Sequence, residues 1–129
     1  MMQCLIVSGD REARDLVKVG LEQTGVFEIE TAEDGWAFEM VKAKPFRLVV
    51  VDTALGGDGV ELLRSVRAAM PNAELLLIAR DKGDGRPQAK DKQEFGVYAF
   101  LPFPIDATEF FKTIARLVDR LNAGAAAAA

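Results

Sequence analysis

Five short apolar runs, separated by stretches with helical periodicity, constrain the fold of this chain more than any other feature. The runs are rich in Val, Ile, Leu and Phe and have the length of strands, and they cover residues 3–8, 27–31, 47–52, 74–79 and 97–101. The segments between or after them that repeat apolar residues at helical spacing are 11–24, 34–43, 60–70 and 108–121. Parallel strands need helical crossovers, so the pattern predicts an α/β fold, a three-layer (αβα) sandwich with a mostly parallel sheet.

Aspartates stand where three of the helices are expected to begin. Asp10 precedes the first helix, and Asp58 and Asp106 are each followed three residues later by a glutamate, Glu61 and Glu109. An aspartate that accepts hydrogen bonds from the first helical amides is a common N-cap, and the glutamate completes a capping box. These three carboxylates therefore have a structural explanation before any functional one.

Two segments depart from the regular pattern. Residues 80–94 contain Gly83, Gly85 and Pro87 and are dense in charge, so a fourth helix is expected to be short, displaced or frayed. Residues 122–129 are low in complexity and rich in alanine, and we interpret them as the start of a linker or as an artificial extension. The expected domain is therefore residues 1–121.

Composition narrows the class of function. The chain has 129 residues, half of them hydrophobic, which is enough for one domain with its own core. It contains no histidine, which removes imidazole bases and the commonest zinc ligand and argues against an enzyme. The net charge of −4 comes without a basic stripe, so a nucleic-acid surface is not expected. No membrane-spanning run or secretory signal occurs, and we expect a cytoplasmic protein that binds other proteins.

Asp52 ends the third apolar run, a glycine-rich loop follows it, and Phe103-Pro104 follows the fifth run. This arrangement resembles the receiver domain of bacterial response regulators, of the chemotaxis-regulator type, over nearly the whole chain to about Leu121. The resemblance implies a flavodoxin-like, doubly wound sheet of five parallel strands in the order 2-1-3-4-5. It also implies a role in two-component (phosphorelay) signalling, with Asp52 as the phospho-acceptor candidate.

The metal site of such receivers is altered in this sequence. In the family, a divalent metal, usually Mg²⁺, is held by the phospho-acceptor aspartate and by an acidic pair after the first strand. Here the places of that pair hold Ser8 and Gly9. Asp10 lies one position further, and it is a candidate metal ligand together with Asp52, although helix capping is its expected role. Because Mg²⁺ is usually anchored by carboxylates, the sequence predicts a poor metal site.

The phosphoryl-binding positions are altered as well. The family places a Thr or Ser at the end of the fourth strand and a lysine before the proline that follows the fifth strand. Here these positions are Ala79 and Phe103. Arg80 follows Ala79, and we hypothesise that its guanidinium neutralises Asp52 internally. These changes predict a degenerate site that lacks most of the charge compensation phosphoryl transfer requires.

Two further expectations concern the fifth strand. Phe100 occupies the place of the aromatic residue that rotates inward on phosphorylation in the family. We expect an inward, fixed Phe100, and the alternative is an ordinary strand aromatic packed at the sheet edge. The Phe103-Pro104 bond is expected to be cis, as the matching bond is in the family.

Three functions are compatible with these residues. The first is a conventional receiver that is switched by phosphorylation of Asp52, and the second, which we favour, is a degenerate pseudo-receiver that binds protein partners without phosphate. The third is a flavodoxin-like cofactor binder, which the loops after the first and third runs argue against. The expected partners are a histidine kinase or a downstream effector, which includes a fused output domain.

The last helix carries more apolar residues than one narrow stripe needs, namely Phe110, Phe111, Ile114, Leu117, Val118 and Leu121. One interpretation is a partner surface, such as a homodimer contact. The other is that the helix covers the part of the core that a thinly apolar fourth helix leaves open. The sequence does not decide between them.

Overall fold

Five strands and three helices follow one another in the part of the chain that the computed structural model describes, residues 1–33, 45–52, 59–79 and 96–128. They are β1 (Met2–Val7), α1 (Arg11–Glu22), β2 (Phe27–Ala32), β3 (Leu48–Asp52), α3 (Gly59–Ala69), β4 (Glu74–Ala79), β5 (Val97–Pro102) and α5 (Ala107–Ala128). All five predicted strands are confirmed to within one residue at either end. The helix predicted at 34–43 and the fourth helix expected within 80–94 lie outside the described residues.

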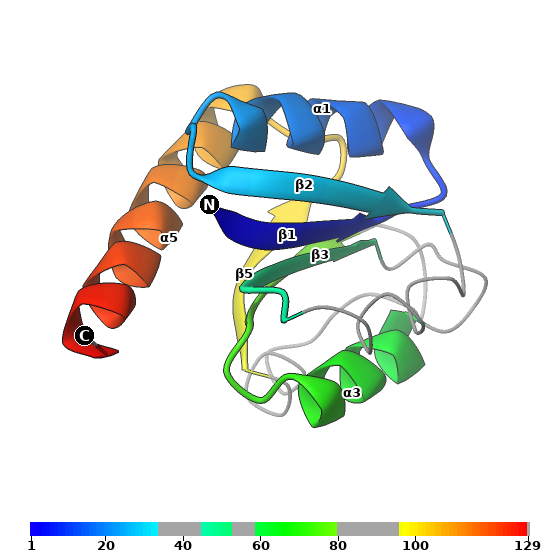
Figure 1. Ribbon diagram of the computed structural model, residues 1–129. Coiled ribbons are helices and arrows are strands. Elements are labelled where there is room, and N and C mark those ends of the chain that lie inside the picture. The colour runs from blue at the N-terminus through cyan, green and yellow to red at the C-terminus, as the bar shows by residue number, and fades with distance from the viewer. Residues whose placement is uncertain (34–44, 53–58, 80–95, 129) are drawn as a thin grey trace.

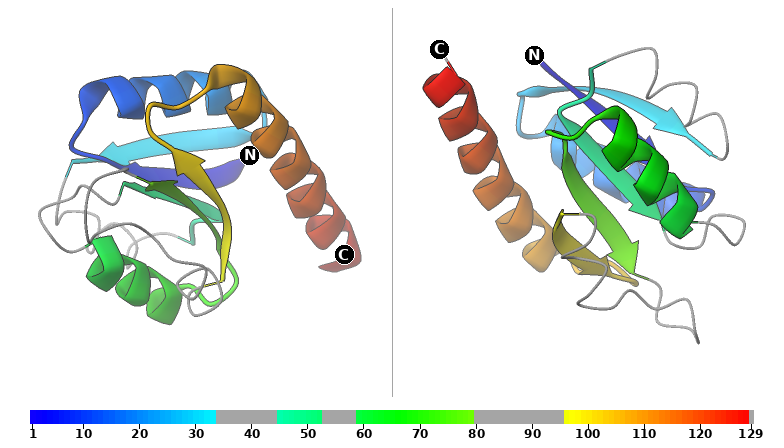
Figure 2. Two further views of the ribbon diagram at one scale, coloured as in Figure 1. Left: turned by 180° about the vertical axis from the view of Figure 1, so that it is seen from behind. Right: turned by 90° about the horizontal axis from the view of Figure 1, so that it is seen from below.

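The strands form one parallel sheet in the order β2-β1-β3-β4-β5, which confirms the expected topology. β3 lies at the centre, and all five of its residues are buried. Helices α1 and α5 cover one face of the sheet and α3 lies against the other, as Figure 1 and the two further views in Figure 2 show. The predicted three-layer sandwich is therefore confirmed.

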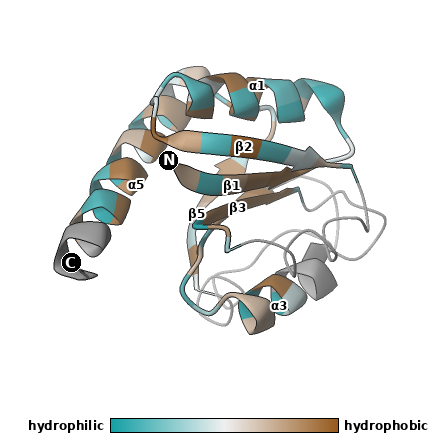
Figure 3. Cartoon of the chain, viewed as in Figure 1, coloured by the Kyte–Doolittle hydropathy of each residue, from teal (hydrophilic) through white to brown (hydrophobic). Residues whose placement is uncertain are grey.

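Alternation of side chains along the strands divides the core into two clusters. Val49 and Val51 of β3 face α3, where they join Val66 and Met70. Their neighbours on the strand face the opposite side and join the apolar residues of α1 and α5. Figure 3 shows the hydrophobic colour along β3 that burial on both faces requires. The single cysteine, Cys4, lies in this second cluster, and burial raises the pKa of its thiol.

The two helix starts that the structure describes fully are capped as predicted. The Asp10 carboxylate accepts hydrogen bonds from the backbone amides of Glu12 (2.9 Å) and Ala13 (3.3 Å). The Asp106 carboxylate accepts one from the amide of Glu109 at 3.1 Å. Asp58, the third predicted cap, lies outside the described residues.

Most of the apolar surface of α5 is used to cover the sheet. Four of its six large apolar residues are buried, Val118 is partly buried, and Phe111 is 44% exposed. This supports the interpretation in which α5 covers the core.

The helix also continues to Ala128, seven residues beyond the predicted end at Leu121, because alanine is the best helix former even where no apolar face remains to be buried. None of the described helices has the length and apolar character needed to cross a membrane.

One arginine fixes the turn after α3 to the start of β5. The Arg67 guanidinium donates hydrogen bonds to the backbone carbonyls of Pro71 (2.8 Å), Ala73 (2.9 Å) and Gly96 (3.2 Å). A planar guanidinium with five donors suits such convergent carbonyls. Arg67 thereby joins the beginnings of β4 and β5, whose opposite ends carry the candidate site.

Close packing of α1 on α5 depends on Gly20. A Cβ atom added at Gly20 would lie 2.3 Å from the ring of Phe110, which is fully buried. We expect Gly20→Ala to lower the free energy of unfolding by about 1 kcal/mol, because overpacking of about 2 kcal/mol exceeds the helix-propensity gain of about 1 kcal/mol. Urea denaturation measures this change. Phe110→Leu should remove the penalty of Gly20→Ala in the double variant, and a stabilising Gly20→Ala in the original background would contradict the contact.

Candidate functional site

The register of the sheet places Ser8 beside Asp52. Val7 pairs with Val51 across the parallel β1–β3 ladder, so the next residue of each strand, Ser8 and Asp52, stands at the same edge. This is the carboxyl edge of the sheet, where open α/β folds place their ligand-binding and reactive groups. The predicted position of Asp52 at the tip of a central buried strand is therefore confirmed.

Ser8 and Asp52 form a buried hydrogen bond. The Ser8 hydroxyl donates to Oδ2 of Asp52 at 2.7 Å, and the two residues are 0% and 1% exposed. The same hydroxyl oxygen accepts a hydrogen bond from the Asp10 amide at 3.1 Å. A short bond to a carboxylate is among the stronger hydrogen bonds in proteins, and a buried carboxylate needs such partners. Ser8 is therefore a direct partner of Asp52.

Arg14 supports the same edge from α1. Its guanidinium donates to the Ser8 carbonyl oxygen at 3.0 Å and lies 3.4 Å from the Glu33 carboxylate, just after β2. The Arg14 side chain is only 14% exposed, but that of Glu33 is 74% exposed, so solvent screens this ion pair and the bond to the Ser8 carbonyl is the more protected contact. Arg14 thus ties the loop that holds Ser8 to the end of β2.

The described side-chain oxygens at this edge do not form the set of ligands that Mg²⁺ requires. The Ser8 hydroxyl oxygen carries no charge and already accepts a hydrogen bond from the Asp10 amide, and Oδ1 of Asp10 accepts hydrogen bonds from the amides that begin α1. Gly9 offers no side-chain oxygen and is exposed. Mg²⁺ prefers an octahedral shell of oxygens anchored by carboxylates. Within the described ranges, no group of three or more Asp, Glu, Cys or His side chains is placed to hold a metal ion.

The remaining predicted site positions lie at the ends of β4 and β5. Asp52 pairs with Ile78, so Ala79 follows one residue further along β4, and Ala79 pairs in turn with Pro102. The fold thereby brings Asp52, Ala79 and Phe103 to one edge, as the sequence predicted. Arg80 lies outside the described residues, so its pairing with Asp52 stays a prediction.

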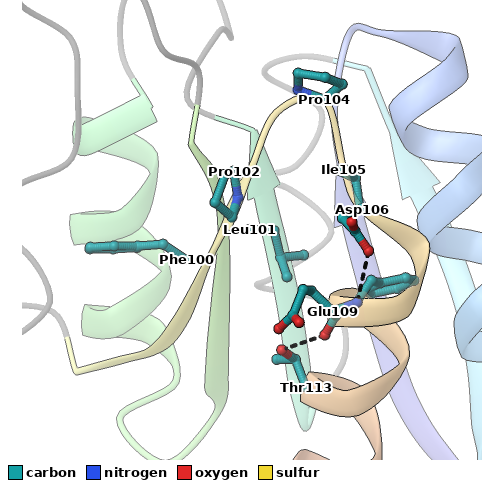
Figure 4. Close-up of a pocket in the computed structure, with 9 residues that line it drawn as sticks. Phe100, Leu101, Pro102, Pro104, Ile105, Asp106, Glu109 and Thr113 are labelled. Carbon is teal, nitrogen blue, oxygen red and sulfur yellow. Dashed lines mark hydrogen bonds between the residues drawn. The ribbon is translucent and has the colours of Figure 1, made fainter.

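Phe103 packs as an apolar residue. It is partly buried against the cluster formed with α1 and α5, and the Phe103-Pro104 peptide bond is cis, as predicted. Phe100 is partly buried against the other cluster, and Figure 4 shows its ring pointing away from α5 toward α3. The structure therefore orients Phe100 toward the core on the α3 side, and its role as a switch stays a prediction.

Sequence reasoning missed the partnership between Ser8 and Asp52 and the supporting contacts of Arg14. It treated Ser8 only as a poor substitute for a metal-binding acid. The signal was present in the predicted neighbouring strands. Ser8 follows the last paired residue of β1, Val7, and Asp52 follows its partner in β3, Val51, so the two side chains lie side by side. The contact of Arg14 with a backbone carbonyl has no comparable signal, since it depends on how α1 leaves the sheet.

Comparison with known proteins adds sequence and structural relatives. No protein-family model matches the chain. The chain is 30% identical over 118 residues to the protein PetR of Rhodobacter capsulatus, and the match covers 91% of this chain and 48% of PetR. The chain thus spans about half the length of that relative.

The solved structures that resemble this chain include receiver domains. The receiver domain of NtrX from Brucella abortus is 26% identical, with a TM-score of 0.75 and coverage of 90% of this chain and 98% of that domain. A CheY-like receiver domain protein from Methanospirillum hungatei is 21% identical, with a TM-score of 0.80 and coverage of 96% of this chain and 98% of that protein. The second similarity concerns the fold, whereas the first extends to the sequence.

Proposed function

This chain is a receiver domain of the response-regulator type, and we propose that it signals by binding protein partners without phosphorylation of Asp52. Receiver domains belong to two-component systems, in which they act as signalling modules rather than as enzymes. The observation that carries the proposal is the buried hydrogen bond from Ser8 to Asp52, at 2.7 Å. It occupies the carboxylate oxygen on the side where an acidic pair would otherwise hold a metal beside Asp52.

Charge compensation is the physical reason for the proposal. Phosphoryl transfer depends on positioning and on positive charge around the transferred group, supplied by a metal and by basic side chains. Ser8 and Gly9 stand in place of the acidic pair, and Phe103 stands in place of the lysine and packs on the core. Asp52 is then held as a fixed structural carboxylate.

The proposed partners are a histidine kinase, a downstream effector or a fused output domain, and we propose that the domain acts in the cytoplasm. Residues 1–121 form the proposed receiver unit, and the alanine-rich residues 122–129 are the proposed start of a linker. A homodimer through α5 would rest on Phe111, the α5 residue that remains substantially exposed among its large apolar residues. Analytical ultracentrifugation at high protein concentration tests it, and a monomer would remove it.

A second function, the conventional phospho-switch, is favoured by one observation. Asp52 is retained at the carboxyl tip of β3, the position of the phospho-acceptor in the family. The two functions differ in their response to a phosphoryl mimic.

Titration with beryllofluoride and millimolar magnesium, followed by two-dimensional NMR, tests the proposal. We expect no saturable shifts of the amides around Asp52 in the original protein. Asp52→Asn is the control for nonspecific effects, and Ser8→Asp tests whether the missing carboxylate is the cause, because it returns an acid next to Asp52. Saturable shifts that vanish in Asp52→Asn would establish the phospho-switch and overturn the proposal.

A further inference from the structure

Strand β2 forms one edge of the sheet, on the side opposite β5 (Figure 2). It aligns with β1 without a register shift, from the pair of Met2 and Phe27 to the pair of Val7 and Ala32. Within the described ranges, no other strand pairs with it. β2 contains no proline, lysine or bulge, the features that commonly keep another chain from pairing with an edge strand. The edge of β2 is therefore suited to receive another extended segment.

The hydrogen bonds to β1 show which backbone groups of β2 face outward. The Met2 amide donates to the Val26 carbonyl at 2.9 Å, and the Ser8 amide donates to the Ala32 carbonyl at 3.0 Å. Parallel ladders use every second residue of a strand, so the even-numbered residues of β2 bond to β1. The N–H and C=O groups of residues 27, 29 and 31 therefore point away from β1, in the direction that a further strand would occupy.

The two faces of β2 differ in character. Phe27 and Ile29 pack with the apolar cluster of α1 and α5. Glu28 and Glu30 lie on the opposite face, because side chains alternate along a strand. Glu28 is exposed, and its carboxylate accepts a hydrogen bond from the neutral side-chain amide of Gln3 at 3.0 Å, which leaves its negative charge uncompensated. A segment paired with β2 would thus meet apolar side chains on one face and acidic ones on the other.

A second copy of this chain is a poor occupant of the edge. An antiparallel copy centred on Ile29 would place Glu28 of each chain opposite Glu30 of the other. Like charges directly opposite each other on paired strands are destabilising, whereas opposite charges stabilise the pairing. The charges of β2 therefore favour a basic segment of a different protein.

We propose that the edge of β2 binds an extended segment of a partner protein in which lysine or arginine alternates with apolar residues. The inference rests on the proposed function as a protein-binding module and names a surface for it. The outward groups of Ile29 and Thr31 supply backbone hydrogen bonds, and Glu28 and Glu30 select basic side chains. The apolar residues of the segment extend the face that Phe27 and Ile29 form.

The test uses two synthetic peptides and the isotope-labelled protein. Valine alternates with lysine in one peptide, and glutamate replaces every lysine in the other. We expect the lysine peptide to give saturable NMR shifts of the Ile29 and Thr31 amides and to slow their hydrogen exchange with water. The amides of Glu28 and Glu30 already bond to β1, so their exchange should change little. The glutamate peptide should bind much more weakly, and high salt should weaken binding of the lysine peptide.

Two variants test the backbone and the charge separately. Ile29→Pro removes an outward N–H group, leaves the bonds to β1 in place and should abolish binding. Glu28→Lys should weaken binding of the lysine peptide by about tenfold, because a repulsive cross-strand pair replaces an attractive one. Glu109→Lys changes the same residue type in the first turn of α5, next to the opposite edge strand, and should leave binding unchanged. Circular dichroism checks that each variant folds, and Glu28→Lys, at an exposed position, decides the test if the proline variant does not fold.

The inference fails if neither peptide binds, if both bind equally, or if the shifts lie away from β2. It also fails if the Ile29 and Thr31 amides become protected as the protein concentration rises without peptide, since a second copy would then occupy the edge. No phosphate, beryllium or magnesium is present, so each of these results would leave phosphorylation independence untouched, whereas the beryllofluoride titration tests that independence alone.

Discussion

Replacing Phe110 with alanine is expected to lower the free energy of unfolding by about 3 to 5 kcal/mol. Phe110 is completely buried among apolar residues of α1, α5 and the sheet. Truncation removes its contacts and leaves a cavity that Gly20, with no side chain, cannot fill. Urea or guanidinium denaturation monitored by circular dichroism measures the change in a domain of this size.

The neighbouring residue provides a matched control for this prediction. Phe111 is the same residue type one position further along α5, but it is 44% exposed, and its ring centroid lies 5.9 Å from that of Phe110. Phe111→Ala should cost less than about 1 kcal/mol, because little buried area and one ring contact are lost. Equal losses for the two variants would mean that α5 is not packed on the sheet through Phe110.

Ser8→Ala is expected to lower the free energy of unfolding by about 2 kcal/mol, because it removes a donor from a buried carboxylate. Ser8 and Asp52 are both buried, and the hydroxyl also accepts a hydrogen bond from the Asp10 amide. The variant removes the partner that the Ser8 hydroxyl provides to that amide and to Oδ2 of Asp52, in a region of low dielectric. Denaturant titration near neutral pH measures the loss.

A double-mutant cycle isolates the contribution of the pair. Asp52→Asn removes the charge with little change of shape, so Ser8→Ala should cost less in that background than in the original protein. The difference is the coupling energy between Ser8 and Asp52, expected at about 1 kcal/mol or more. A coupling energy of zero would show that Ser8 does not stabilise Asp52, and it would remove the observation on which the proposed function depends.

The large elements of the fold were predictable because they depend on local spacing. The strands were located to within one residue by apolar runs, and the starts of α1 and α5 by the aspartates that cap them. The end of α5 was wrong by seven residues, since the pattern of buried residues stops at Leu121 while the helical preference of alanine continues. Patterns of neighbouring residues thus locate strands and helix starts well, but they locate the unpacked end of a helix poorly.

The sequence predicted which residues lie at the candidate site, but not the contacts between them. Asp52, Ser8 and Phe103 were identified by their places at strand ends, and the sheet brings them to one edge. The proton donor to Asp52, the support of Ser8 by Arg14 and the burial of Phe103 against α1 and α5 were not predicted. Each depends on distances between residues from different elements, and a linear pattern carries no such distances.

The sequence by itself determined the fold class, the parallel strands and the residues that gather at the carboxyl edge, because periodicity, capping and crossover geometry act over a few residues at a time. Only the tertiary structure decided that the Ser8 hydroxyl satisfies Asp52, that Gly20 admits the ring of Phe110, and which backbone groups of β2 face outward at the edge of the sheet. The physical reason is that hydrogen bonds and close packing act over a few ångströms, between groups up to 90 residues apart in this chain. Such contacts exist only after the sheet and its helices have set the spacing between them.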